Sequence, residues 1–114
     1  MRGRCAEDTD WGRIAALYEA LAALTPSPVI ELNRAVAVGM AFGPEAGLEL
    51  ADRLMAEPLL KAYHLLPSVR GDLLEKLGRF HEARTEFERA ATLAHNARER
   101  KLLLDRAAAA VLPR

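Results

Sequence analysis

Apolar residues recur at intervals of three and four near the start of the chain, the spacing of one face of an α-helix. They are Trp11, Ile14, Leu17, Tyr18, Leu21 and Leu24. Asp8, Thr9 and Asp10 precede this stripe and offer side-chain acceptors to the unpaired amides of a first helical turn. The prolines of TPSP follow it and cannot continue the hydrogen-bond ladder. A first helix is therefore expected from about Thr9 to Leu24.

The next segment, VIELNRAVAVGMA, has apolar positions on most sides of a helix. Ser27 followed by Pro28 is a typical helix start, with a capping residue before a proline. The β-branched residues would also suit a strand, but Glu31, Asn33 and Arg34 break the strict alternation that a strand shows. The pattern favours a helix that is largely buried between its neighbours.

Turn residues predict two further helices in the middle of the chain. Gly43 supplies a turn before a helix over residues 44–56. A fourth helix is expected over residues 58–77, but Pro67 lies inside it and removes one hydrogen bond. We expect a kink, or a short first piece broken off, within the turn before Pro67.

Gly78 closes the fourth segment, a fifth helix is expected over residues 79–94, and HNA separates it from a last helix over residues 97–112. The chain is 51% hydrophobic but only 5% aromatic, so Ala and Leu, two strong helix formers, carry most of its apolar content. The sequence therefore predicts an all-α fold of about six helices joined by short links.

Small and large apolar residues alternate along the fourth and fifth helices in the order used by the tetratricopeptide repeat. The residues in this pattern are Gly71, Leu74, Gly78, Phe80, Ala83, Phe87 and Ala90. Small residues allow the two helices of such a unit to cross closely, and larger ones fill the groove alongside. Pro67 and Arg70 depart from the pattern, which has tryptophan and leucine at their positions. The expected architecture is an antiparallel stack of helix hairpins, a tetratricopeptide-like superhelix.

The repeat divides the chain into one domain over residues 9–112, preceded by a disordered leader or expression remnant over residues 1–8. Residues 9–24 resemble the second half of a repeat, 28–56 a degenerate copy, 58–95 the better-defined copy, and 97–112 a capping helix. Two alignments of the degenerate copy remain open. One uses Ala46, Leu50 and Arg53, and the other uses Gly47, Ala51 and Leu54. The capping helix carries Arg98, Arg100 and Lys101, most simply as a solvated face.

Charge and cysteine content exclude several classes of function. Sixteen basic and sixteen acidic residues give a formal net charge of zero, so direct nucleic-acid contact is not expected. Cys5 is the only cysteine, which rules out a disulfide framework and fits a reducing cytoplasm. The chain shows no secretory signal and no apolar run long enough to span a membrane. A soluble cytoplasmic protein is expected.

No motif predicts catalysis, a cofactor or a metal. His81-Glu82 begins like HExxH, but Thr85 stands where the second histidine is needed. His64 and His95 are each isolated in the sequence from any cluster of metal ligands, and no glycine-flanked nucleophile or phosphate-binding loop occurs. We expect no catalytic, cofactor-binding or metal-binding residues.

Polar residues on the first helix of each pair are the candidates for partner contact. Asn33 and Arg34 interrupt an apolar helix, and the favoured interpretation is that their buried groups fix helix packing through hydrogen bonds. The alternative places Asn33 on the concave side, where stacked helix pairs hold peptides. In the better-defined repeat, the same side is expected to carry Ser68, Asp72, Glu75 and Lys76. Such a mixed-charge groove favours a protein partner.

Four stretches resemble a known family: TDWGRIAALYEAL, SPVIELNRAVAVGMAFGPEAGLEL, YHLL and RGDLLEKLGRFHEARTEFERAATLAHNARERKLLL. They are similar to the C-terminal tetratricopeptide-like extension of bacterial extracytoplasmic-function (ECF) sigma factors. The resemblance extends from about Thr9 to Leu104, with LNRAVAV and the Asn96-to-Glu99 start as its more specific parts. The Pro67-Ser68 pair departs from the family's more helical sequence after YHLL.

The resemblance implies a non-catalytic regulatory domain that contacts its own sigma domains or the RNA polymerase core. The promoter-binding sigma domains themselves are absent from this sequence, so the chain looks like a detached domain. The alternative is a free-standing tetratricopeptide adaptor that binds an extended peptide of another protein. A face around Trp11, left bare by a missing preceding helix, is expected to allow a homodimer.

Overall fold

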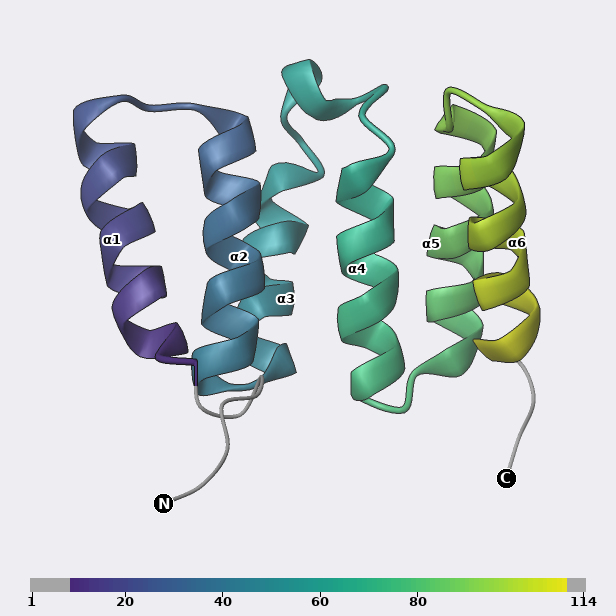
Figure 1. Cartoon of the computed structure of the whole chain (residues 1–114), viewed down its shortest axis with the longest axis horizontal. Coiled ribbons are helices and arrows are strands. Elements are labelled where there is room, and N and C mark those ends of the chain that lie inside the picture. Colours follow the sequence, from purple (N-terminus) through teal and green to yellow (C-terminus); the bar gives the residue numbers. More distant parts are fainter. Residues whose placement is uncertain (1–8, 111–114) are drawn as a thin grey trace.

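The computed structural model describes residues 9–110. These residues form six α-helices and no strand. The helices are α1 (Trp11–Leu24), α2 (Pro28–Phe42), α3 (Pro44–Leu54), α4 (Leu65–Lys76), α5 (Phe80–Leu93) and α6 (Ala97–Ala110). Each runs antiparallel to the one before it, and α1 and α6 lie at opposite ends of the row (Figure 1). The all-α helix stack is confirmed. The expected leader, with Cys5, and residues 111–112 of the last helix lie outside the described residues.

Local capping explains where the helices begin. Asp10 Oδ1 accepts a hydrogen bond from the amide of Arg13 at 3.1 Å, so α1 starts two residues later than expected. Asn96 Oδ1 accepts the amide hydrogen of Glu99 at 2.8 Å at the start of α6. Ser27 occupies the N-cap position of α2 but makes no capping hydrogen bond through its side chain. Pro28, whose fixed φ suits a first helical position, defines that start instead.

The break expected before Pro67 is confirmed. The chain forms a short 3-10 turn, η2 (Pro58–Leu60), and α4 begins only at Leu65. Pro67 is therefore the third residue of α4, where a backbone N–H has no partner inside the helix in any case. Because its ring is buried there, the proline fills the core without breaking a hydrogen bond.

Each helix packs mainly against its immediate neighbours in the sequence, so the hairpins stack in one direction. In the second hairpin, Gly71 on α4 faces the ring of Phe87 on α5, and a Cβ at Gly71 would lie 2.8 Å from that ring. In the first hairpin, a Cβ at Gly47 on α3 would lie 2.7 Å from the carbonyl oxygen of Ala35 on α2. Gly47 and Ala51, which belong to one of the two predicted alignments, are both buried.

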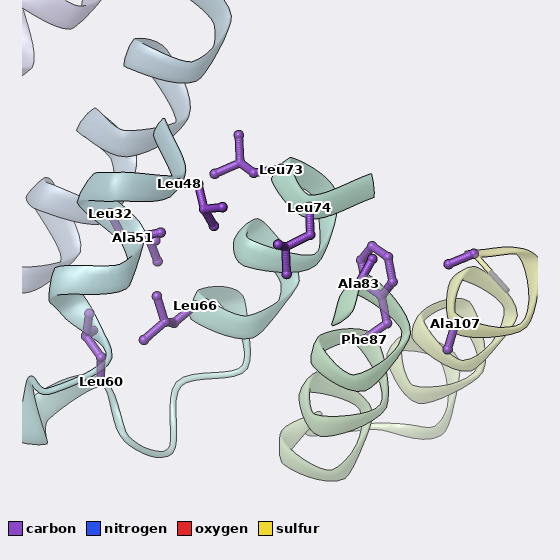
Figure 2. Close-up of a cluster of buried hydrophobic side chains, with 11 residues drawn as sticks. Leu32, Leu48, Ala51, Leu60, Leu66, Leu73, Leu74, Ala83, Phe87 and Ala107 are labelled. Atoms are coloured by element: carbon purple, nitrogen blue, oxygen red, sulfur yellow. The ribbon is translucent and has the colours of Figure 1, made fainter. Parts of the chain in front are cut away.

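The core runs through the stack as one cluster (Figure 2). Leu48, Leu66 and Leu73 fill the space between α3 and α4, and the cluster continues to Phe87 on α5 and Ala107 on α6. Figure 2 shows the Phe87 ring on the side of α5 that faces α4, with Leu74 of α4 beside it. The apolar layer thus links both hairpins and α6.

Three burial predictions are wrong. Gly78 does not mediate a close crossing, because its φ of 79° makes it a turn residue with open space at its Cβ position. Phe80, the first residue of α5, is 40% exposed and does not fill the groove between helices. The helix α2 is less buried than expected, because Val36 and Met40 are exposed on one side of it.

Arg70, at a position where the predicted repeat has leucine, forms ion pairs with two other helices. Its Nε lies 2.7 Å from Asp52 Oδ1 on α3, and its Nη1 lies 3.1 Å from Glu86 Oε2 on α5. Burial alone would lower the pKa of the guanidinium, but hydrogen bonds and charge from Asp52 and Glu86 outweigh it and raise that pKa. One cation thus ties α4 to both the preceding and the following helix.

The bare face at the start of the stack differs from the predicted one. Trp11 is half-buried, whereas Leu17, Leu21 and Leu24 are exposed along α1. The apolar face open at this end is therefore a leucine stripe rather than a tryptophan face. The homodimer stays a prediction.

Candidate functional site

A hollow of about 360 Å³ lies where α2, α4 and α6 border a common space, and because it contains the predicted residues of α4 we call it the principal hollow. Its apolar floor consists of Val36, Gly39, Met40, Val69 and Leu73. A Cβ at Gly39 would lie 2.9 Å from Leu73, so the glycine allows α2 and α4 to approach at the bottom of the hollow. Within this floor, the Met40 side chain remains 44% exposed. The hollow therefore presents accessible apolar surface.

A closed set of ion pairs forms the polar wall of the hollow. Asp72 accepts hydrogen bonds from Lys76 Nζ at 2.8 Å and from Arg106 Nη2 at 3.1 Å. The same Arg106 nitrogen lies 2.7 Å from Glu75 Oε1. The Arg106 guanidinium also lies over the Phe87 ring, 4.5 Å from its centre. These contacts fix Arg106 of α6 against two acidic residues of α4.

The pKa of Asp72 reflects this arrangement. Partial burial by itself would raise the pKa of the carboxyl, but the hydrogen bonds and positive charges of Lys76 and Arg106 outweigh that effect and lower it. Arg106 responds in the opposite sense: burial would lower its pKa, but Asp72 and Glu75 raise it. Asp72 is therefore held as a carboxylate between two cations.

The predicted interaction residues of α4 are brought together. Ser68, Asp72 and Lys76 all line the hollow, since they lie one helical turn apart on the same face of α4. Glu75 is connected to it through Arg106. Whether a partner touches these residues stays a prediction.

The favoured interpretation of Asn33 is wrong, because this residue is exposed and its amide is not buried against a neighbour. Helical spacing places it one turn before Val36 and two turns before Met40, on the same side of α2 as the edge of the hollow. Arg34 is partly buried and pairs with Glu31 on its own helix at 3.1 Å. Arg34 does not line this hollow. Among the contacts of the described residues, its guanidinium is paired with its own helix and not with a neighbouring one.

Sequence reasoning missed Arg106 and the apolar floor of the site, of which Val36 and Met40 are the exposed members. The two apolar residues were assigned to a buried helix, although with Asn33 they form a stripe with a polar member, which is typical of a half-exposed face. Arg106 lies in the last helix and meets Asp72 only through folding. No spacing in the sequence links two residues so far apart.

The histidines are less isolated than expected. The rings of His64 and His95 meet edge to face with centres 5.6 Å apart, and His64 Nε2 lies 3.7 Å from Glu99 Oε1. Within residues 9–110, however, no group of three histidine, cysteine or acidic side chains is placed to hold a metal ion. This contact joins the start of α4 to the start of α6.

Comparisons with known proteins give one informative match. A protein of Rhizobium meliloti (strain 1021), described as uncharacterized, is 53% identical over 96 residues, which cover 82% of this chain and 22% of that protein. No family model and no solved structure matches the chain. The chain thus spans about a fifth of the relative it matches. In the part of the chain that the structure describes, no helix is both long and apolar enough to cross a membrane.

Proposed function

We propose that this chain is a non-catalytic protein-interaction domain of an ECF-type sigma factor. In this role it contacts the sigma domains or the RNA polymerase core in the cytoplasm and thereby modulates transcription initiation. The observation that carries the interaction role is the hollow between α2, α4 and α6, which combines exposed apolar side chains with fixed polar ones. Stacked helix pairs commonly present such surfaces to other polypeptides.

The link to transcription is supported by the resemblance of residues 9–104 to the tetratricopeptide-like extension of these sigma factors. The relative from Rhizobium meliloti is consistent with a domain that belongs to a longer polypeptide, because the match covers only 22% of it. The zero net charge supports contact with protein rather than with the phosphate backbone of DNA.

The test is a deletion in the longer relative. The segment that matches this chain is removed, and promoter-specific transcription is measured with purified RNA polymerase, beside the intact protein. We expect transcription to change in amount or in its response to regulation. Unchanged output and unchanged regulation would contradict the control role.

Binding of the intact relative to the polymerase core distinguishes the alternative. If the relative does not bind the core, the sigma-factor assignment fails and the chain is better described as a tetratricopeptide-like adaptor. If it binds the core and supports transcription from a defined promoter, the adaptor alternative fails.

A further inference from the structure

A second hollow, of about 570 Å³, lies between α3 and the start of α5. It is bordered by α3, the helix that lies behind α2 in Figure 1, and it shares no lining residue with the principal hollow. Its aromatic and charged lining residues are Phe42, Glu45, Glu49, Asp52 and Arg79. We call it the acidic hollow.

Acidic residues outnumber basic ones in the lining of the acidic hollow. Glu45, Glu49 and Asp52 supply three negative charges. Arg79 supplies one positive charge, so the lining has a net charge of minus two. The hollow therefore attracts a positively charged group of a ligand.

The ion pairs of the lining do not remove this surplus. Asp52 pairs with Arg70, which also pairs with the buried Glu86. Arg79 pairs with Glu82. These three partners add one positive and two negative charges to a lining of minus two, so the wider group has a net charge of minus three.

Glu45 and Glu49 carry the surplus. They lie one turn apart on α3, so their like charges repel each other. Glu45 is in the first turn, where the positive end of the helix dipole favours an acidic side chain, but Glu49 lies beyond that turn. Both are exposed, and within residues 9–110 neither forms an ion pair. A cation held between them would relieve the repulsion.

Phe42 adds an aromatic ring to the same hollow. It is the last residue of α2, and its side chain is 70% exposed. Phe42 also lines a neighbouring hollow of about 380 Å³ beside α1. There, two acidic residues are matched by two basic ones: Glu19 and Glu49 by Arg34 and Arg53. The negative surplus therefore belongs to the acidic hollow and not to its neighbour.

The chain binds one of its own arginines with the same residue types. Arg106 lies over the ring of Phe87, 4.5 Å from its centre. Its Nη2 lies 3.1 Å from Asp72 and 2.7 Å from Glu75, two carboxylates of one helix. Because a guanidinium is planar, it can lie on a ring and donate hydrogen bonds from its edge at the same time. The acidic hollow offers the same combination, one ring and two carboxylates of one helix.

We propose that the acidic hollow binds an arginine side chain from a basic protein segment of different sequence, with the guanidinium on the Phe42 ring and hydrogen-bonded to Glu45 and Glu49. Side chains one helical turn apart are about 5 to 6 Å from each other, so one guanidinium can reach both carboxylates.

This inference names a partner chemistry for the interaction role proposed above and rests on that role, but not on its link to transcription. Deletion of the whole domain can alter transcription while the acidic hollow binds no arginine. Arginine binding can also hold while transcription is independent of the domain, so the two failures are distinguishable.

The test is a titration of the isotope-labelled chain, followed through its backbone amide signals by NMR. The probe is a synthetic glycine- and serine-rich peptide with two arginines, beside counterparts that carry lysine or citrulline instead. Citrulline keeps the shape of arginine without its charge. We expect the arginine peptide to shift signals of residues 42–52, the lysine peptide to bind about threefold more weakly, and the citrulline peptide not to bind. Equal binding of the arginine and citrulline peptides, or shifts confined to other residues, would overturn the proposal.

Matched variants locate the binding site. Glu49→Gln and Phe42→Leu should each weaken binding of the arginine peptide about threefold, the size typical of one exposed ion pair or one exposed contact between a cation and a ring. The controls are Glu88→Gln and Phe80→Leu, because both residues are exposed on α5 and neither lines the hollow. The amide spectrum shows whether each variant is folded, and the peptide comparison on the unaltered chain does not depend on any variant. Equal weakening by the controls would contradict the assignment.

Two further measurements identify the source of the arginine. If N-acetyl-arginine amide binds as tightly as the peptide, the hollow serves a small molecule, and the assignment to a protein segment fails. Sedimentation at several concentrations tests a second copy of the chain as the partner. If the chain self-associates and Glu49→Gln abolishes this, the arginine comes from a second copy, and the proposed partner of different sequence is wrong. We expect weaker binding of the small molecule and no effect of Glu49→Gln on sedimentation.

Discussion

The two central hairpins reach the same arrangement through different contacts. In the α4–α5 hairpin, a glycine meets the flat ring of a buried phenylalanine, Gly71 against Phe87. In the α2–α3 hairpin, Gly47 meets backbone atoms of Ala35 and Gly39, so the two helices touch main chain to main chain. The sequence predicts a better-defined and a degenerate copy of a repeat for these two hairpins, yet both stack alike, because the space available at the crossing matters more than the particular residue that fills it.

The largest loss of stability is expected when the ring of Phe87 is removed. Phe87→Ala removes a fully buried aromatic side chain and should lower the free energy of unfolding by about 4 kcal/mol. Leu48→Ala, which truncates a buried side chain of the first hairpin, should cost about 2 to 3 kcal/mol. Urea unfolding followed by circular dichroism measures both. An equal loss in the two variants would show that the second hairpin does not depend on one ring.

The two glycines should differ in the same experiment. Gly47→Ala places a Cβ 2.7 to 2.8 Å from backbone atoms that cannot move independently, and should cost about 3 kcal/mol. Gly71→Ala places a Cβ 2.8 Å from the Phe87 ring, a side chain that can shift, and should cost about 1 kcal/mol.

Gly12→Ala on α1 is the control for both, because its nearest neighbour would be 3.8 Å away. It should leave stability unchanged or raise it slightly, since alanine is the better helix former. A greater loss of stability in Gly71→Ala than in Gly47→Ala would contradict the prediction that a contact with backbone is harder to relieve than a contact with a ring.

The next largest loss of stability is expected when the ion pairs of Arg70 are removed. Arg70→Leu restores the leucine of the repeat but leaves Glu86 buried without its cation, and should cost about 2 kcal/mol. The double variant Arg70→Leu/Glu86→Leu should recover most of that loss, because no buried charge remains. Thermal unfolding of the single and double variants measures the difference. No recovery in the double variant would mean that Arg70 contributes more than charge balance.

The smallest predicted effect is on how the stability of the chain depends on pH. The folded chain lowers the pKa of Asp72 below the value of about 3.9 that an unfolded aspartate has. The stabilisation is therefore fully present above that value and is lost as the pH falls through the lowered pKa. Since Asp72 is partly exposed, Asp72→Asn should cost less than about 1 kcal/mol at neutral pH and should reduce the loss of stability on acidification.

Asp105→Asn is the control for this prediction, because Asp105 pairs with Lys101 in a well-exposed position on α6. Urea unfolding at neutral and acidic pH measures both variants. The prediction is wrong if the stability of the Asp72 variant falls with acid as steeply as that of the unaltered chain.

The fold was largely predictable because its determinants are local. Prolines, capping residues and three-to-four spacing define the helices within a few residues, and Gly71, Ala83 and Phe87 identify the hairpin crossing. The errors arise where neighbours decide burial. Phe80 and Asn33 have the residue types and spacing of packed positions, yet each is exposed in the part of the chain that the structure describes.

The candidate site was only half predictable. Ser68, Asp72 and Lys76 share one face of one helix, so helical spacing alone places them together. Arg106 reaches Asp72 across 34 positions of sequence, and its place depends on how α5 and α6 fold back on α4. Met40 was missed because hydrophobicity by itself does not distinguish an inward side chain from one that lines an open surface.

The single-file order of the helices has a consequence for partial melting. The main packing of α6 is against α5, yet its Arg106 lines the hollow that α2 and α4 border. In proteins whose units contact only their neighbours, the terminal unit can detach while the others stay folded. Fraying of this one helix would open the hollow on one side, release a cation from Asp72 and leave α1 to α5 in place.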